Sequence, residues 1–320
     1  MTPFSRAEID AALQLVHAVL PPTPQQRWPL LEKRLGFEAW VKHENHTPVG
    51  AFKVRGGLTW FDTLRRESPG ARGVVGATRG NHGQSVGFAA RRHGLAAAIV
   101  VPHGNSVEKN AAMRALGVEL IEHGEDFQAA REFAGRVAAE RGWPMVPSFH
   151  RELVRGVATG WVEFFGATQP DVVFVPIGLG SGLAACAAAR AYCGAKSRIV
   201  GVVSTLAPAY LESWRAGRPI EAPATTRIAD GMACRVPDPD ALSVIRAEAD
   251  DVVAVSDDEV AAAMRALFAD THNVAEGAGA AALAAAMQQR DRLAGRSVGL
   301  ALTGGNVDTA LFAKVLAGAP

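Results

Sequence analysis

Short apolar runs alternate with stretches of helical pattern along almost the whole chain. The runs are residues 74–77, 98–101, 118–121, 172–175, 199–203 and 298–302. Strands that alternate with helices form parallel sheets with helices on both faces, because right-handed crossovers connect consecutive strands. At 320 residues the chain is also longer than one compact core usually organises. We therefore predict an α/β fold with two domains.

Four further local patterns complete the coarse assignment. The apolar residues of 6–20 form a helical stripe that Pro21 must end. Residues 40–42 predict a short strand, and residues 52–64 and 183–192 predict helices.

Charge and composition exclude several classes of function. The 33 basic and 32 acidic residues leave a net charge of +1, and no sustained run of Lys and Arg is present. Nucleic acid is therefore not an expected partner. Arg6, Glu8 and Asp10 interrupt the first apolar positions, so we expect neither a signal peptide nor a membrane span and place the chain in the cytoplasm. The three cysteines lack metal-ligand spacing and are expected to be free thiols.

Lys53 is the first candidate for chemistry. It follows Gly50, which permits an unusual backbone shape, and stands where a helix is expected to begin. Apolar surroundings and a helix N-terminus disfavour the charged form of a lysine, which makes its amine a nucleophile. Taken alone, a lysine is more often a solvated surface charge. Lys53 needs support from the rest of the chain.

A glycine-rich turn at residues 178–182 follows the apolar run 172–175 and precedes an alanine-rich helix. Glycines let backbone N–H groups close around a phosphate, and the helix adds the positive end of its dipole. A nicotinamide dinucleotide fingerprint would need a glycine where Leu183 stands and an acidic residue where Ser204 stands. A phosphate site is the favoured interpretation, with a tight turn alone as the alternative.

Two more turns follow predicted strands. In residues 78–85, exposed N–H groups and Asn81 could hold a carboxylate or a phenolic oxygen, while the ring of His82 is more simply structural than a base or metal ligand. Thr303 follows the last apolar run, at the carboxyl-end crevice where open α/β sheets bind ligands. An ordinary turn would explain Thr303 equally well in isolation.

In this order, the four segments resemble the fold-type II pyridoxal-5'-phosphate (PLP) enzymes, specifically the threonine/serine dehydratase and serine racemase branch. The resemblance runs from about residue 24 to about residue 308. It implies a fold similar to the tryptophan synthase β chain, with PLP in the cleft between two domains. Residues 1–48 and 147–320 would form the large domain and residues 49–146 the small one. The resemblance also implies a homodimer.

The resemblance assigns roles to individual residues. Lys53 would carry PLP as an imine and later act as the base, with Phe52 packed against the ring. Asn81 would bind the phenolic oxygen, and Thr303 would face the pyridine nitrogen. Glu276 resembles an acidic position near the cofactor. The phosphate loop would consist of Gly178, Leu179, Gly180, Ser181 and Gly182. The substrate loop would include Thr78, Arg79, Gly80 and His82.

The implied activity is β-elimination. An L-3-hydroxy amino acid of the threonine, serine, phenylserine or hydroxyaspartate type would lose water and then ammonia to give a 2-oxo acid. Alternatives within the fold are a β-replacement enzyme or a racemase, and a non-catalytic amino-acid-binding protein is a further one. Residues 80–84 resemble the dehydratases more than the cysteine synthases, whose loop usually has Thr after the Asn.

Two departures from the family pattern and the position of the chain end refine these expectations. Arg79 stands where racemases present a serine, and a guanidinium cannot shuttle protons near neutral pH, so we expect negligible racemisation. The stretch that supplies divalent-metal ligands in the family, residues 204–210, has no carboxylate, so we expect no metal and no dependence on Mg²⁺. The chain ends soon after Asp308, so we expect no regulatory domain and no feedback control by isoleucine.

Overall fold

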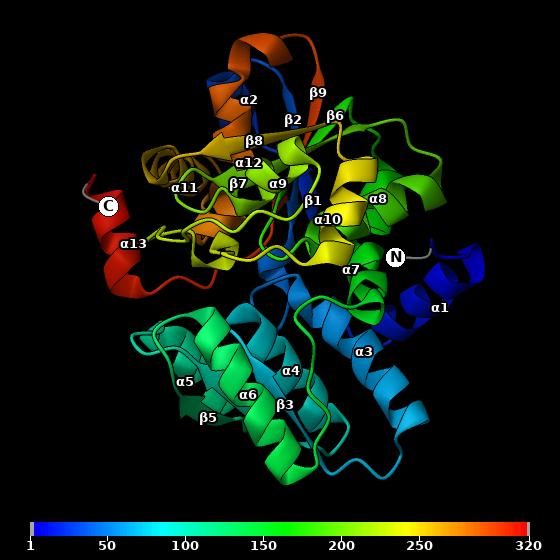
Figure 1. Cartoon of the computed structure of the whole chain (residues 1–320). Coiled ribbons are helices and arrows are strands. Elements are labelled where there is room, and N and C mark those ends of the chain that lie inside the picture. The colour runs from blue at the N-terminus through cyan, green and yellow to red at the C-terminus, as the bar shows by residue number, and fades with distance from the viewer. Residues whose placement is uncertain (1–2, 319–320) are drawn as a thin grey trace.

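Two separate sheets organise the chain, one above the other in Figure 1. The computed structural model describes residues 3–318. The larger sheet has the strand order β1-β2-β9-β6-β7-β8, and the smaller has the order β3-β4-β5. Every pair of neighbours is parallel except β1 with β2. The strands are β1 Gln25–Arg27, β2 Glu38–His43, β3 Gly73–Ala77, β4 Ala96–Val101, β5 Glu119–Glu122, β6 Val172–Pro176, β7 Arg198–Ser204, β8 Asp251–Val255 and β9 Ser297–Leu302.

Helices cover both faces of both sheets (Figure 1). The helices are α1 Arg6–His17, α2 Pro29–Leu35, α3 Lys53–Glu67, α4 Asn81–Arg92, α5 Val107–Ala115, α6 Phe127–Arg141, α7 Arg151–Ala167, α8 Ser181–Cys193, α9 Ala209–Ala216, α10 Pro239–Glu248, α11 Asp257–Thr271, α12 Gly277–Gln288 and α13 Thr309–Leu316. Three short 3-10 helices are η1 Glu44–His46, η2 Asp230–Met232 and η3 Arg290–Leu293. No helix within residues 3–318 is long and apolar enough to cross a membrane.

The smaller sheet shows why the apolar runs become buried strands. Val75 and Ala98 face α6, whereas Val74 and Ile99 face the helices on the opposite side. Successive side chains of a strand point to opposite faces, so a strand with helices on both sides must be apolar at every position. The predicted α/β class with parallel, helix-covered sheets is confirmed.

Each of the six predicted runs, and the short strand predicted at 40–42, overlaps a strand, but two strands were not predicted. β8 has the run of residues 252–255 that could have revealed it. β1 reads Gln-Gln-Arg and pairs with β2 at the sheet edge. A short polar edge strand carries no apolar signal, because one of its faces remains in solvent.

The first helix ends earlier than predicted, at His17 rather than near Pro21. Ser5 and Glu8 form a reciprocal capping box at its start. The N–H groups of Val19 and Leu20 both bond to the carbonyl of Val16, which closes the chain into a turn before the prolines.

Helix α3 links the two sheets, since it packs against α7 beside the larger sheet and against α4 beside the smaller one. The smaller sheet and helices α4 to α6 occupy residues 73–141, within the segment 49–146 expected as the small domain. The exact boundaries of the two domains remain a prediction.

Candidate active site

One pocket lies where the carboxyl ends of strands from both sheets face each other. Turns after β3, β6 and β9 line it, together with the start of α3. Ligands of parallel sheets bind at this end, where the strand-to-helix turns expose backbone groups. Every residue expected in the site lines this pocket: Phe52, Lys53, Thr78, Arg79, Gly80, Asn81, His82, Gly178, Leu179, Gly180, Ser181, Gly182 and Thr303.

Lys53 begins helix α3 and reaches into the pocket. Its Nζ lies 4.7 Å from the centre of the Phe52 ring, and its backbone carbonyl accepts a hydrogen bond of 2.7 Å from Ser85. Burial lowers the pKa of Lys53 to about 8, against the opposing effect of the Glu276 charge. A sizeable fraction of the amine is therefore neutral in weakly alkaline solution and able to attack a carbonyl carbon.

The glycine turn after β6 is packed too closely for side chains. A Cβ at Gly178 would lie 2.3 Å from the carbonyl oxygen of Gly231. Gly180 has a φ of 93°, a conformation that favours glycine, and α8 begins at the next residue, Ser181. Leu183 fills the core beneath the turn, at the position where a dinucleotide fingerprint requires glycine. These features fit a phosphate held by N–H groups and a helix N-terminus.

Substituting Gly178 tests this turn. Gly178→Ala would push a backbone carbonyl or the turn itself aside, so we expect at least a roughly tenfold loss of PLP affinity, about 1.4 kcal/mol. Absorbance titration of the apo-protein with PLP measures it. Gly166→Ala is the matched control, because a Cβ there meets no atom within 4 Å. Equal PLP affinity in the two variants would contradict the assignment.

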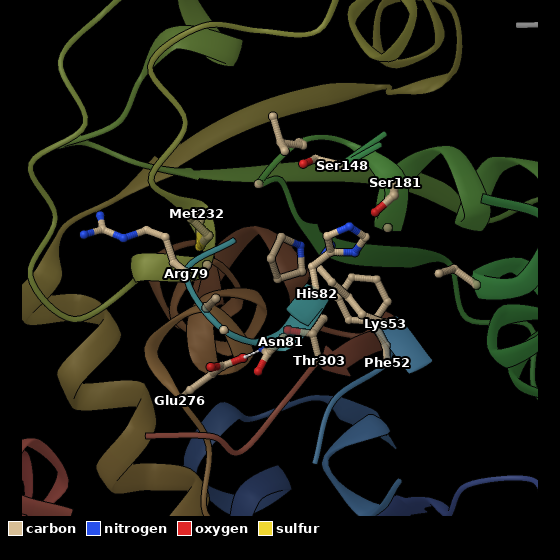
Figure 2. A pocket seen from close by; sticks show the side chains of 18 of the residues that line it. Phe52, Lys53, Arg79, Asn81, His82, Ser148, Ser181, Met232, Glu276 and Thr303 are labelled. Carbon is tan, nitrogen blue, oxygen red and sulfur yellow. Dashed lines mark hydrogen bonds between the residues drawn. The ribbon is translucent and has the colours of Figure 1, made fainter. Parts of the chain in front are cut away.

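Asn81, the first residue of α4, is held at both ends of its amide. Its Nδ2 donates to Glu276 Oε1 at 2.5 Å (Figure 2). Its Oδ1 accepts from Asn306 Nδ2 at 2.9 Å. Asn306 also donates to the carbonyl of Val49 at 2.8 Å, which fixes the direction of its own amide. One N–H of Asn81 remains for a ligand, because an amide nitrogen carries two hydrogens.

Glu276 belongs to a charge cluster that also contains the buried Lys109 and the half-buried Asp230. Lys109 Nζ lies 2.9 Å from Glu276 Oε2 and 2.7 Å from Asp230 Oδ2. Burial raises the pKa of Glu276, and the Lys109 ammonium and the Asn81 amide act against this rise. Burial alone would lower the pKa of Lys109, but Glu276 and Asp230 raise it above its ordinary value. Lys109 and Asp230 were not predicted as site residues, since neither belongs to a recognisable sequence motif.

His82 and Thr303 add two neutral polar groups. Burial, together with the Lys53 charge, lowers the pKa of His82 to about 3, so its ring is neutral. Its Nε2 is buried and has no hydrogen-bond partner among residues 3–318. Thr303 lines the pocket, and its carbonyl accepts the N–H of Phe52 at 3.0 Å. An orphaned buried nitrogen beside a glycine turn and a lysine of lowered pKa fits a pocket built for a phosphorylated aldehyde.

In the loop before Asn81, the backbone faces the pocket near Lys53, whereas the charged group of Arg79 lies farther away. Thr78 Oγ1 accepts the N–H of Gly80 at 2.9 Å, and Gly80 has φ 157° and ψ −80°, a combination that favours glycine. Arg79 is half-buried, and its guanidinium extends away from Lys53 and Asn81 (Figure 2). The backbone of the loop, rather than the Arg79 charge, therefore lies closest to Lys53.

Comparison with known proteins gives a consistent result. The family model described as pyridoxal-phosphate dependent enzyme matches residues 17–304. The chain is 35% identical to an L-threonine ammonia-lyase of Geobacter sulfurreducens over 288 residues, which cover 89% of this chain and 71% of that protein. It is 30% identical to an L-threo-3-hydroxyaspartate ammonia-lyase of Saccharomyces cerevisiae over 298 residues, covering 92% and 91% of the two chains.

Solved structures resemble it along nearly the whole chain. The processed form of threonine deaminase isoform 2 from Solanum lycopersicum has a TM-score of 0.88 and 27% identity, covering 99% of this chain and 95% of that chain. Maize serine racemase has a TM-score of 0.90 and 26% identity, with coverage of 99% and 98%.

Proposed function

Because this chain belongs to the family of pyridoxal-phosphate dependent enzymes, we propose that it removes water and then ammonia from an L-3-hydroxy amino acid to give a 2-oxo acid. The observation that carries the proposal is the convergence of Lys53, Asn81, the glycine turn and Thr303 in one pocket. The relatives named for threonine and hydroxyaspartate support the class of substrate.

Lys53 has two tasks in this reaction. Its amine is the group that would attach to the aldehyde carbon of PLP, and once released it can accept the proton from the substrate α-carbon. When bound, PLP supplies the electron sink for that deprotonation. The lowered pKa of Lys53, about 8, keeps the energetic cost of exchanging a proton small near neutral pH.

The other residues bind and orient. Gly178 to Gly182 would hold the phosphate through backbone N–H groups, and the free N–H of Asn81 would donate to the phenolic oxygen. Thr303 would offer the pyridine nitrogen a neutral partner, which favours early departure of the β-hydroxyl over transamination. The N–H groups of residues 78–82 would bind the substrate carboxylate.

An assay across L-threo and L-erythro 3-hydroxy amino acids tests the activity. We expect equal amounts of 2-oxo acid and ammonia from at least one member of the threonine, serine, phenylserine and hydroxyaspartate series. The same reactions with an added thiol identify β-replacement, and chiral analysis identifies racemisation. A D-amino acid formed as fast as the 2-oxo acid, or a thiol adduct as the main product, would overturn the proposal.

We also propose that the protein is a cytoplasmic homodimer, as the family resemblance implies. Light scattering of the purified holoenzyme measures its mass, and a monomeric mass would contradict the dimer.

A further inference from the structure

Lys109 joins the two halves of the molecule inside the pocket. It lies on α5, beside the smaller sheet. Asp230 lies in η2 and Glu276 immediately precedes α12, and both elements lie beside the larger sheet. The Lys109 side chain is only 6% exposed, and its Nζ contacts both carboxylates within 2.9 Å. One ammonium therefore serves two acidic groups.

The stem of Lys109 also supports the loop before Asn81. A Cβ at Gly80 would lie 2.3 Å from Lys109 Cδ, so this methylene group packs directly on the Gly80 backbone. The same side chain thus braces the loop with its stem and contacts Glu276 with its charge.

The charge state of Glu276 depends on the groups around it. It faces Lys109 from α5, Asp230 from η2, Asn81 from α4 and, at longer range, Lys53 from α3. Burial and the Asp230 charge both favour the protonated form, and Lys109 is the cation in contact with the carboxylate. Without that cation, Glu276 would take up a proton more readily.

An ionised Glu276 restrains the Asn81 amide. A carboxylate only accepts hydrogen bonds, so it must meet the Nδ2 side of Asn81, as observed. A protonated carboxyl can also donate, and the charge-assisted bond to Asn81 would be weakened. The ionised form therefore helps to keep an N–H of Asn81 directed into the pocket.

We infer that Lys109 is a positioning residue of the reaction: its ammonium keeps Glu276 ionised and thereby holds the Asn81 loop in its working geometry. The inference rests on the proposed function only for the placement of PLP beside Asn81 and Lys53. Lys109 acts through Glu276 and Asn81 and needs no contact of its own with substrate or cofactor.

The pH titration of the visible absorption band of the holoenzyme provides one test. In the holoenzyme the titrating group is the Lys53 nitrogen joined to PLP. The negative charge of Glu276 favours the protonated form of this nitrogen, as it does for the free amine, so losing that charge should move the midpoint of the titration to lower pH. We expect Lys109→Met and Glu276→Gln each to shift it down by roughly one pH unit, and the double variant to add nothing further. Lys109→Arg should restore the wild-type midpoint.

Arg55→Met is the matched control. Arg55 is also a buried cation, but its guanidinium pairs with Glu163 at 2.6 Å and it is not among the described residues that line the pocket. We expect this variant to lower Tm and to leave the midpoint of the band unchanged. A midpoint that stays or rises in Lys109→Met, or additive shifts in the double variant, would overturn the inference.

A measurement without cofactor separates this inference from the proposed function. The ¹³C resonance of the Glu276 carboxyl in the apo-protein reports its protonation directly. Its titration should move to higher pH in Lys109→Met and return in Lys109→Arg. Loss of turnover with every substrate would refute the proposed function alone, whereas an unmoved Glu276 titration would refute the role of Lys109 alone.

Discussion

Lys53→Ala should lose the visible absorption band of the bound cofactor and at least about 10⁴-fold in kcat/KM. The variant lacks both the amine that attaches to the aldehyde and the base at the α-carbon. In the wild type, Lys53 is suited to both tasks because it has a lowered pKa and lies at the start of α3, beside the Phe52 ring. Absorbance near 410 nm, about the wavelength expected of such a link, and the 2-oxo acid assay measure the two effects.

Borohydride reduction and peptide mapping provide the control. The wild-type label should lie on the peptide that contains Lys53, and Lys196→Ala, which changes an exposed lysine, should keep both label and activity. A visible band that survives in Lys53→Ala, or a label on another lysine, would refute the assignment.

Arg55→Met should lower the free energy of unfolding by about 3–5 kcal/mol. The Arg55 guanidinium is fully buried and lies 2.8 Å from Glu44 and 2.6 Å from Glu163. After its removal, Lys42 would remain as the buried cation next to Glu163. An uncompensated buried carboxylate is costly because desolvation is no longer balanced by attraction. The urea midpoint and slope measure the loss.

The stability of the wild type in acid depends on the same buried ion pairs of Arg55 and Lys42 with Glu163. Burial alone would raise the pKa of Glu163, but Arg55 and Lys42 lower it from 4.5 to about 2. A depressed pKa in the folded state stabilises the fold above pH 4.5, and this contribution disappears as the pH falls from 4.5 towards 2. Arg55→Met should therefore show a weaker loss of stability across this range.

Arg66→Met is the control for this prediction. Arg66 forms an exposed ion pair with Asp62 at 3.2 Å on helix α3, and such pairs contribute about 0.5 kcal/mol or less. Equal urea midpoints for the two variants would show that the buried network contributes no more than a surface pair.

Much of the fold and site could be predicted from local sequence. The apolar runs became strands because a segment covered on both faces has to be apolar throughout. The glycine turn at Gly178 was recognisable because close backbone packing and a positive φ exclude side chains there. Lys53, Asn81 and Thr303 were local candidates because each stands beside a predicted strand or turn, but their roles were predicted only from the resemblance of the ordered segments to the family.

Tertiary structure alone decided the charge clusters. Lys109 and Asp230 are 121 residues apart, and Arg55 and Glu163 are 108 apart. The sequence around Lys109 or Arg55 does not show whether the side chain will be solvated or buried. The acidic partners of both residues come from elements that meet only after folding. Backbone turns and strand burial depend on neighbouring residues, whereas the energy of a buried charge depends on which distant groups share its low-dielectric surroundings. Local sequence therefore determined most of the strands and the glycine turn, and the folded chain determined the charges that surround the site.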